Sequence, residues 1–99
     1  MHFLLIYELA PDYLERRGEF RKEHLELGWQ AHERGELVVA GAMSDPADMA
    51  ALFFNCASAE VVEQFAKGDP YVIHGLVTKY HVRQWNTAIG ETAFTPIRL

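Results

Sequence analysis

A glycine, an acid and a proline stand together at Gly68, Asp69 and Pro70, between a helical and an extended pattern. Gly68 can take the left-handed conformation that closes a helix, and Pro70 prevents the helix from continuing normally. After them, residues 76–85 alternate in the manner of a strand. The junction therefore predicts a helix, a tight turn and a strand in succession, with the Asp69 side chain fixed in orientation. Since Asp before Pro is ordinary turn chemistry, Asp69 could also simply cap the short segment after it.

The chain before the junction divides into the same two patterns. Residues 2–9 are apolar and too short for a helix of their own, which predicts a buried strand. Residues 12–34 repeat with a helical period, and the runs 36–43 and 50–56 flank a turn-rich segment, which predicts a hairpin. Ser58 precedes a second helical pattern. The apolar stripe of the first helix consists of Phe20, His24, Leu27 and Ala31, and Gly18 is a candidate break in that helix.

The resulting order, β-α-β-β-α-β, describes an α+β, ferredoxin-like domain, whose antiparallel sheet carries both helices on one face. The early strands are apolar on both sides, whereas two helices can cover one face only. We therefore expect a homodimer in which two sheets pack face to face. Alternation in the last strand predicts one face with Leu76, Thr78, Tyr80 and Val82, and another with Val77, Lys79, His81, Arg83 and Trp85.

Length and charge limit the classes of function. The 99 residues fit a single domain, with a core over about residues 1–86 and a C-terminal tail over 87–99. The net charge is -5 and the basic residues are scattered, which argues against a nucleic-acid partner. Cys56 is the only cysteine, and no apolar run approaches the ~20 residues that span a bilayer. These features predict a cytoplasmic protein without a membrane partner.

His24 is the candidate partner of Asp69. It lies on the apolar stripe and therefore faces the sheet, where an imidazole needs a hydrogen-bond partner. A carboxylate on one ring nitrogen would fix the tautomer and leave the other nitrogen able to remove a proton near neutral pH. The pattern is also that of a core histidine bonded to a backbone carbonyl. The histidines lack metal-ligand spacing, so we predict neither a metal site nor a cofactor.

Several short motifs resemble those of the YciI-like (YCII-related) family, and the resemblance covers about residues 1–86. It implies the ferredoxin-like, dimeric α/β-barrel fold and an active site made by a His and an Asp, which at the matching places are His24 and Asp69. Arg21 and Tyr71 match the same motifs and are the expected substrate-binding residues. The motifs are Arg21-x-x-His24, Glu33-Arg34-Gly35, Ala40-Gly41-Ala42-Met43 and Lys67-Gly68-Asp69-Pro70-Tyr71.

The resemblance implies a cofactor-independent enzyme that transfers a proton on a small cyclic or aromatic substrate, as a dehydrochlorinase-like lyase or an isomerase does. In this interpretation, His24 is the base and Asp69 orients it. Arg21 or Tyr71 would stabilise negative charge that develops on oxygen. The alternative is a non-catalytic small-molecule binding or accessory module, in which His24 and Asp69 only shape the pocket.

Overall fold

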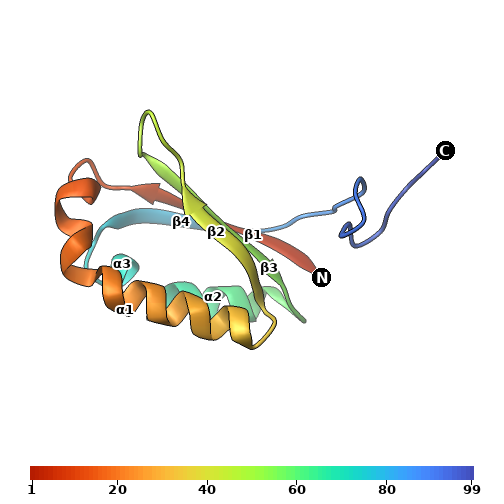
Figure 1. Ribbon diagram of the computed structural model, residues 1–99, viewed down its shortest axis with the longest axis horizontal. Helices are drawn as coiled ribbons and strands as arrows, with labels where there is room; N and C mark the ends of the chain where they lie inside the picture. Colours follow the sequence, from red (N-terminus) through yellow and green to blue (C-terminus); the bar gives the residue numbers. More distant parts are fainter.

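The computed structural model describes residues 1–99 and contains one four-stranded antiparallel sheet, with strand order β2-β3-β1-β4 (Figure 1). The predicted order of elements is confirmed, and one short helix, α3, is added directly after Asp69. The elements are β1 (His2–Leu9), α1 (Tyr13–Glu33), β2 (Leu37–Ala42), β3 (Met49–Asn55), α2 (Ala59–Gly68), α3 (Pro70–Ile73) and β4 (Val77–Gln84).

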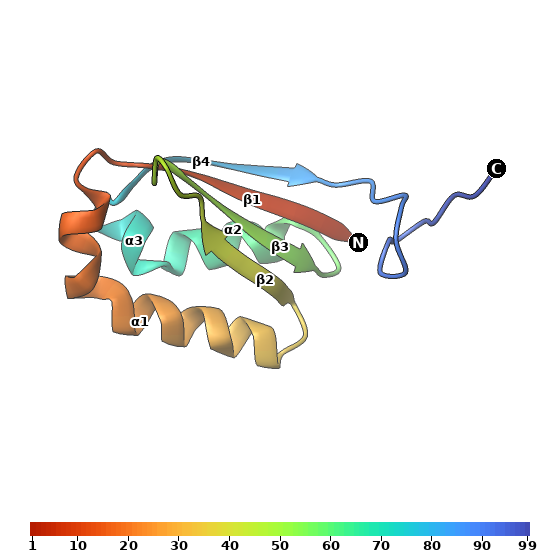
Figure 2. The ribbon, with the colours of Figure 1, turned by 45° about the horizontal axis from the view of Figure 1, so that its top comes forward.

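All three helices lie on one face of the sheet (Figure 2). Strand β1 alternates, so that every second side chain points toward the helices and is buried. Helix α2 packs tightly and buries Val62 and Phe65, whereas the much longer α1 buries only Tyr13 and Ala31. Most of α1 therefore stands away from the sheet. The inward residues of β1 are Phe3, Leu5, Tyr7 and Leu9.

Strand β4 corrects one prediction. Leu9 pairs with Val77 and Glu8 pairs with Lys79, so that Thr78 is an extra residue in the ladder, a β-bulge. The bulge turns Val77 toward the core, onto the same face as Tyr80 and Val82. The simple alternation was therefore wrong for Val77 and Thr78, although it was right for the remainder of the inner face.

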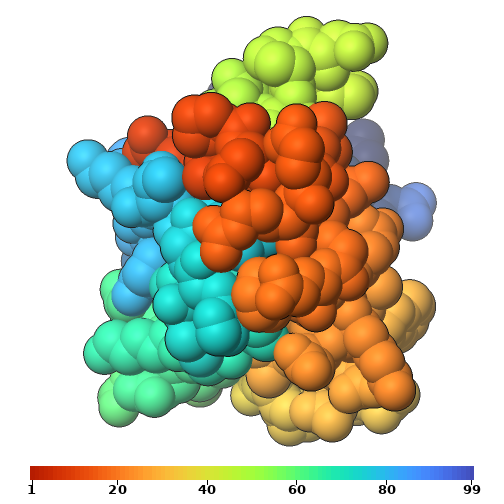
Figure 3. Space-filling view, turned by 90° about the vertical axis from the view of Figure 1, so that its left-hand side faces the viewer, coloured from red at the N-terminus to blue at the C-terminus, as the bar shows by residue number.

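The end of the molecule nearest the start of α1 is closed by α3. Figure 3 shows α1 and α3 against each other on this side, with the β2–β3 hairpin projecting beyond them. The Phe20 and His74 rings stack with centroids 4.2 Å apart, and Arg16 donates a 3.0 Å hydrogen bond to the carbonyl of His74. Helix α1 continues unbroken through Gly18. None of the helices combines the length and apolar composition that a membrane span requires.

The outer face of the sheet carries no helix (Figure 2). Its central positions include Leu4, Ile6 and Phe53, which are only partly buried. The tail, residues 87–99, extends away from the sheet (Figure 1), and Ile89 on it is almost fully exposed. The expected face-to-face homodimer would cover this outer face and stays a prediction.

Candidate functional site

Asp69 is the centre of a buried hydrogen-bond network. It is the N-cap of α3 and is 0% exposed. Its carboxylate accepts three hydrogen bonds: from the Tyr7 hydroxyl at 2.7 Å, from His24 Nδ1 at 2.8 Å and from the Tyr71 backbone N–H at 3.0 Å. Asp69 thus caps the segment after it and also holds His24, so the two interpretations drawn from the sequence describe one arrangement.

The Asp69 bond sets the tautomer of His24. A carboxylate only accepts hydrogen bonds, so in the neutral imidazole Nδ1 carries the proton and Nε2 keeps its lone pair. Nε2 has no protein partner, yet no buried side-chain nitrogen or oxygen in the structure lacks one. Nε2 is therefore open to solvent, which agrees with the 21% exposure of the His24 side chain. An oriented imidazole with a free basic nitrogen can act as a general base.

Tyr71 holds the imidazole from one side. Its ring stacks on the ring of His24, with centroids 3.8 Å apart and an interplanar angle of 7°. The rings of Tyr71 and Tyr13 pack edge to face, with their centroids 5.7 Å apart. Burial raises the pKa of the Tyr71 hydroxyl, while the charges of Arg21 and Arg17 act in the opposite direction. Tyr71 is therefore a neutral group near pH 7 that restricts the rotation of His24.

Tyr7 belongs to the site and was missed from the sequence. Burial, followed by the charge of Asp69, raises the pKa of its hydroxyl far above the usual range, so the hydroxyl stays protonated and donates to Asp69. A signal existed, because the alternation of residues 2–9 places Tyr7 on the face of Leu5 and Leu9, where a buried hydroxyl needs a partner. The sequence could not indicate that the partner was Asp69.

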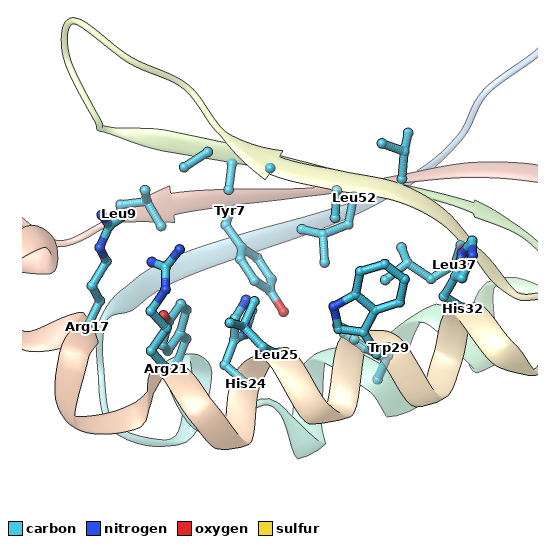
Figure 4. Close-up of a pocket in the computed structure, with 18 of the residues that line it drawn as sticks. Tyr7, Leu9, Arg17, Arg21, His24, Leu25, Trp29, His32, Leu37 and Leu52 are labelled. Atoms are coloured by element: carbon cyan, nitrogen blue, oxygen red, sulfur yellow. The ribbon is translucent and has the colours of Figure 1, made fainter.

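A cavity of about 410 Å³ lies between α1 and the β2 side of the sheet (Figure 4). This volume is within the range of small-molecule pockets, and 14 of its 20 lining residues are hydrophobic. His24 and Tyr7 lie near its middle and Arg17 and Arg21 at one end, whereas Trp29 lies toward the other end, which His32 and Leu37 line (Figure 4). Three of the four residues singled out from the sequence, Arg21, His24 and Tyr71, line this cavity, and the fourth, Asp69, lies behind its wall and is bonded to His24. Arg17 was not predicted.

The fold and the pocket define a ferredoxin-like α+β protein with a hydrogen-bonded His–Asp pair at a ligand-sized cavity. Residues 1–86 match the family model of the YCII-related domain, and the chain belongs to this family. The curated proteins include no match to the sequence.

One solved structure with a similar fold is 5-chloro-2-hydroxyhydroquinone dehydrochlorinase from Burkholderia phenoliruptrix AC1100, in complex with 2,5-dihydroxybenzoquinone. The alignment covers 89% of this chain and 96% of the other, with 21% sequence identity and a TM-score of 0.75. At this identity the similarity concerns the fold, and it confirms the ferredoxin-like topology predicted from the sequence.

Proposed function

We propose that this protein is a cofactor-independent enzyme that removes a proton from a small cyclic or aromatic substrate. One observation carries the proposal: His24 is bonded to a buried carboxylate through Nδ1, while Nε2 is free beside a cavity of about 410 Å³. A histidine that serves the core alone would not need an open nitrogen at a pocket of this size.

In the proposed reaction, the lone pair of His24 Nε2 accepts the substrate proton. The imidazolium that forms lies 2.8 Å from the Asp69 carboxylate, whose negative charge stabilises it. The Tyr7 hydroxyl and the Tyr71 N–H hold the two carboxylate oxygens, so Asp69 keeps its orientation during the transfer. Arg21 is the group that would stabilise negative charge on a substrate oxygen.

We place the reaction among lyases of the dehydrochlorinase type, because the dehydrochlorinase from Burkholderia shares the fold and the small size of the chain. In such a step His24 takes a proton from the keto tautomer of the substrate, in which the chlorinated carbon is tetrahedral. The electron pair of the broken O–H or C–H bond forms a new double bond in the ring system, and chloride leaves with the electron pair of the C–Cl bond. His24 then returns its proton to water, so that one HCl is lost in total. An isomerase would differ only in returning the proton to another substrate carbon.

The test uses the two ring compounds named for the Burkholderia dehydrochlorinase. Chloride release from 5-chloro-2-hydroxyhydroquinone measures elimination, and deuterium incorporation into 2,5-dihydroxybenzoquinone in D₂O measures proton transfer alone. Replacing His24 by Gln should lower either rate by about 10²–10⁴-fold, the usual contribution of a general base. Ligand affinity should change little. His74→Gln, which alters an exposed histidine outside the cavity, is the matched control and should keep the wild-type rate.

Two results would overturn the proposal. The first is a His24→Gln variant with the wild-type rate. The second is a wild-type protein that binds these ring compounds but neither releases chloride nor exchanges deuterium. This second result would favour the alternative, a small-molecule binding module in which His24 and Asp69 only shape the pocket.

A further inference from the structure

The cavity has a charge opposite to that of the protein. Arg17 and Arg21 lie one helical turn apart on α1, and both line the same end of the cavity (Figure 4). No aspartate or glutamate is among the 20 lining residues, although the chain has a formal net charge of -5. Asp69, which is bonded to the lining residues Tyr7 and His24, is fully buried, and its charge is shared among three donors.

The positive charges of these two arginines are not neutralised within the chain. The arginines that form ion pairs are Arg16, with Asp12, and Arg34, with Glu36, whereas Arg17 and Arg21 form none. The guanidinium carbon of Arg17 lies 5.7 Å from the centre of the Tyr13 ring, a cation–π contact that orients the group while leaving its N–H donors free.

The two arginines also lie close to Tyr71, whose ring holds His24 near the middle of the cavity. Both act on the Tyr71 hydroxyl, since the positive charges of Arg21 and Arg17 oppose the rise that burial produces in its pKa. The Tyr71 ring in turn stacks on His24. A ligand held by the guanidinium groups would therefore lie within reach of both the stacked rings and the free nitrogen of His24.

We infer that Arg17 and Arg21 form an anion subsite, and that the substrate is a small planar ring that carries an ionised oxygen group. The inference rests on the proposed function, in which His24 removes a proton from the substrate, and adds the charge of that substrate. A guanidinium group matches a carboxylate or an ionised ring oxygen in geometry, and its charge does not vary over the accessible pH range. The remaining lining is apolar and suits the body of a ring.

The experiment compares matched ligands that differ in charge. One pair is 2,5-dihydroxybenzoate and 2,5-dihydroxybenzamide, which tests a carboxylate. The other pair is 2,5-dihydroxybenzoquinone and 2,5-dimethoxybenzoquinone, which tests an ionised ring oxygen. Titration calorimetry on the full-length protein should show at least one acid binding about tenfold more tightly than its neutral twin, as expected for a charge-assisted hydrogen bond.

The variants locate the effect. Arg17→Gln and Arg21→Gln should each reduce the tenfold preference for the acid by about threefold, because each removes one of the two charged donors. The affinity for the neutral twin should not change. Lys22→Gln removes the same charge from an exposed neighbour outside the cavity and should leave the preference intact. Circular dichroism establishes that each variant is folded, and the exposed Arg21 provides the test if Arg17→Gln is not folded.

The inference is overturned if no acid binds more tightly than its neutral twin, or if both arginine variants keep the preference. Its failure can be told apart from that of the proposed function. A preference for acids without either chloride release or deuterium exchange would refute proton transfer by His24 and leave the anion subsite standing. Deuterium exchange without any preference for the acid would refute the subsite alone.

Discussion

Replacing Tyr7 by Phe tests the buried network, because it deletes one hydroxyl and keeps the ring. Tyr7 is 1% exposed, and its hydroxyl donates to Asp69 over 2.7 Å. Asp69 keeps two donors in the variant, so its carboxylate is not left unpaired. A hydrogen bond to a charged group contributes about 1.5–3 kcal/mol. We therefore expect the free energy of unfolding at pH 7 to fall by about 2 kcal/mol, which lowers the Tm by about 10 °C.

The same variant has a pH signature. Burial and the charge of Asp69 raise the pKa of Tyr7 in the folded protein, whereas an unfolded tyrosine ionises near about pH 10. The stability that Tyr7 contributes is therefore fully present below pH ~10 and is lost as the pH rises toward the folded pKa. One proton changes the unfolding free energy by about 1.4 kcal/mol per pH unit. The difference in unfolding free energy between wild type and Tyr7→Phe should therefore fall to zero by roughly pH 11.5.

Urea unfolding, followed by far-UV circular dichroism from pH 7 to 11.5 at one protein concentration, measures this difference. Tyr80→Phe is the matched control, since Tyr80 lies opposite Tyr7 in the sheet and its hydroxyl contacts Glu63 at 3.3 Å instead of Asp69. The unfolding free energy of Tyr80→Phe should fall by much less than that of Tyr7→Phe. The reasoning is refuted if Tyr7→Phe is as stable as wild type at pH 7, or if the difference is constant up to pH 11.5.

Three further predictions concern other parts of the molecule. Asp69→Ala leaves three donors without their acceptor, and urea unfolding should show a loss of at least about 3 kcal/mol. Gly18→Ala should stabilise α1 by about 0.5–1 kcal/mol, since a Cβ there meets no atom, whereas Gly75→Ala should destabilise the protein because φ is +78°. Ile6→Glu places a charge on the outer face of the sheet and should convert the expected homodimer into monomers, as measured by light scattering. Gln64→Glu, at an exposed position of α2, should not do so. A wild-type protein that is monomeric would contradict this expectation.

Sequence periodicity was sufficient for the order of the four strands and the two longer helices, because each of these elements has a pattern within its own residues, whereas the four residues of α3 are too few to show one. The His24–Asp69 contact was also expected, since the helical stripe turned His24 inward, the Gly-Asp-Pro junction fixed the orientation of Asp69, and the family resemblance implied that the two residues form a pair. Tyr7 could be placed on the inner face but not paired, because Asp69 is 62 residues away. The bulge at Thr78 has no local signal, since it arises from the pairing of β4 with β1.

The cavity and Arg17 depend on tertiary structure. They exist because α1 stands away from the β2 side of the sheet, and no pattern within α1 gives that separation. The catalytic role of His24, the role of Arg21 in substrate binding and the homodimer stay predictions, which the experiments above test.

The capping bond of Asp69 makes the proposed proton transfer depend on one peptide N–H. The same carboxylate oxygen, Oδ1, accepts from the Tyr71 backbone and from His24. Helix α3 has only four residues, so its unfolding would release Asp69, the stacked Tyr71 ring and the imidazole in one event. In the absence of substrate, the rate at which the Tyr71 amide proton exchanges with solvent deuterium would then measure how often α3 unfolds and releases the site.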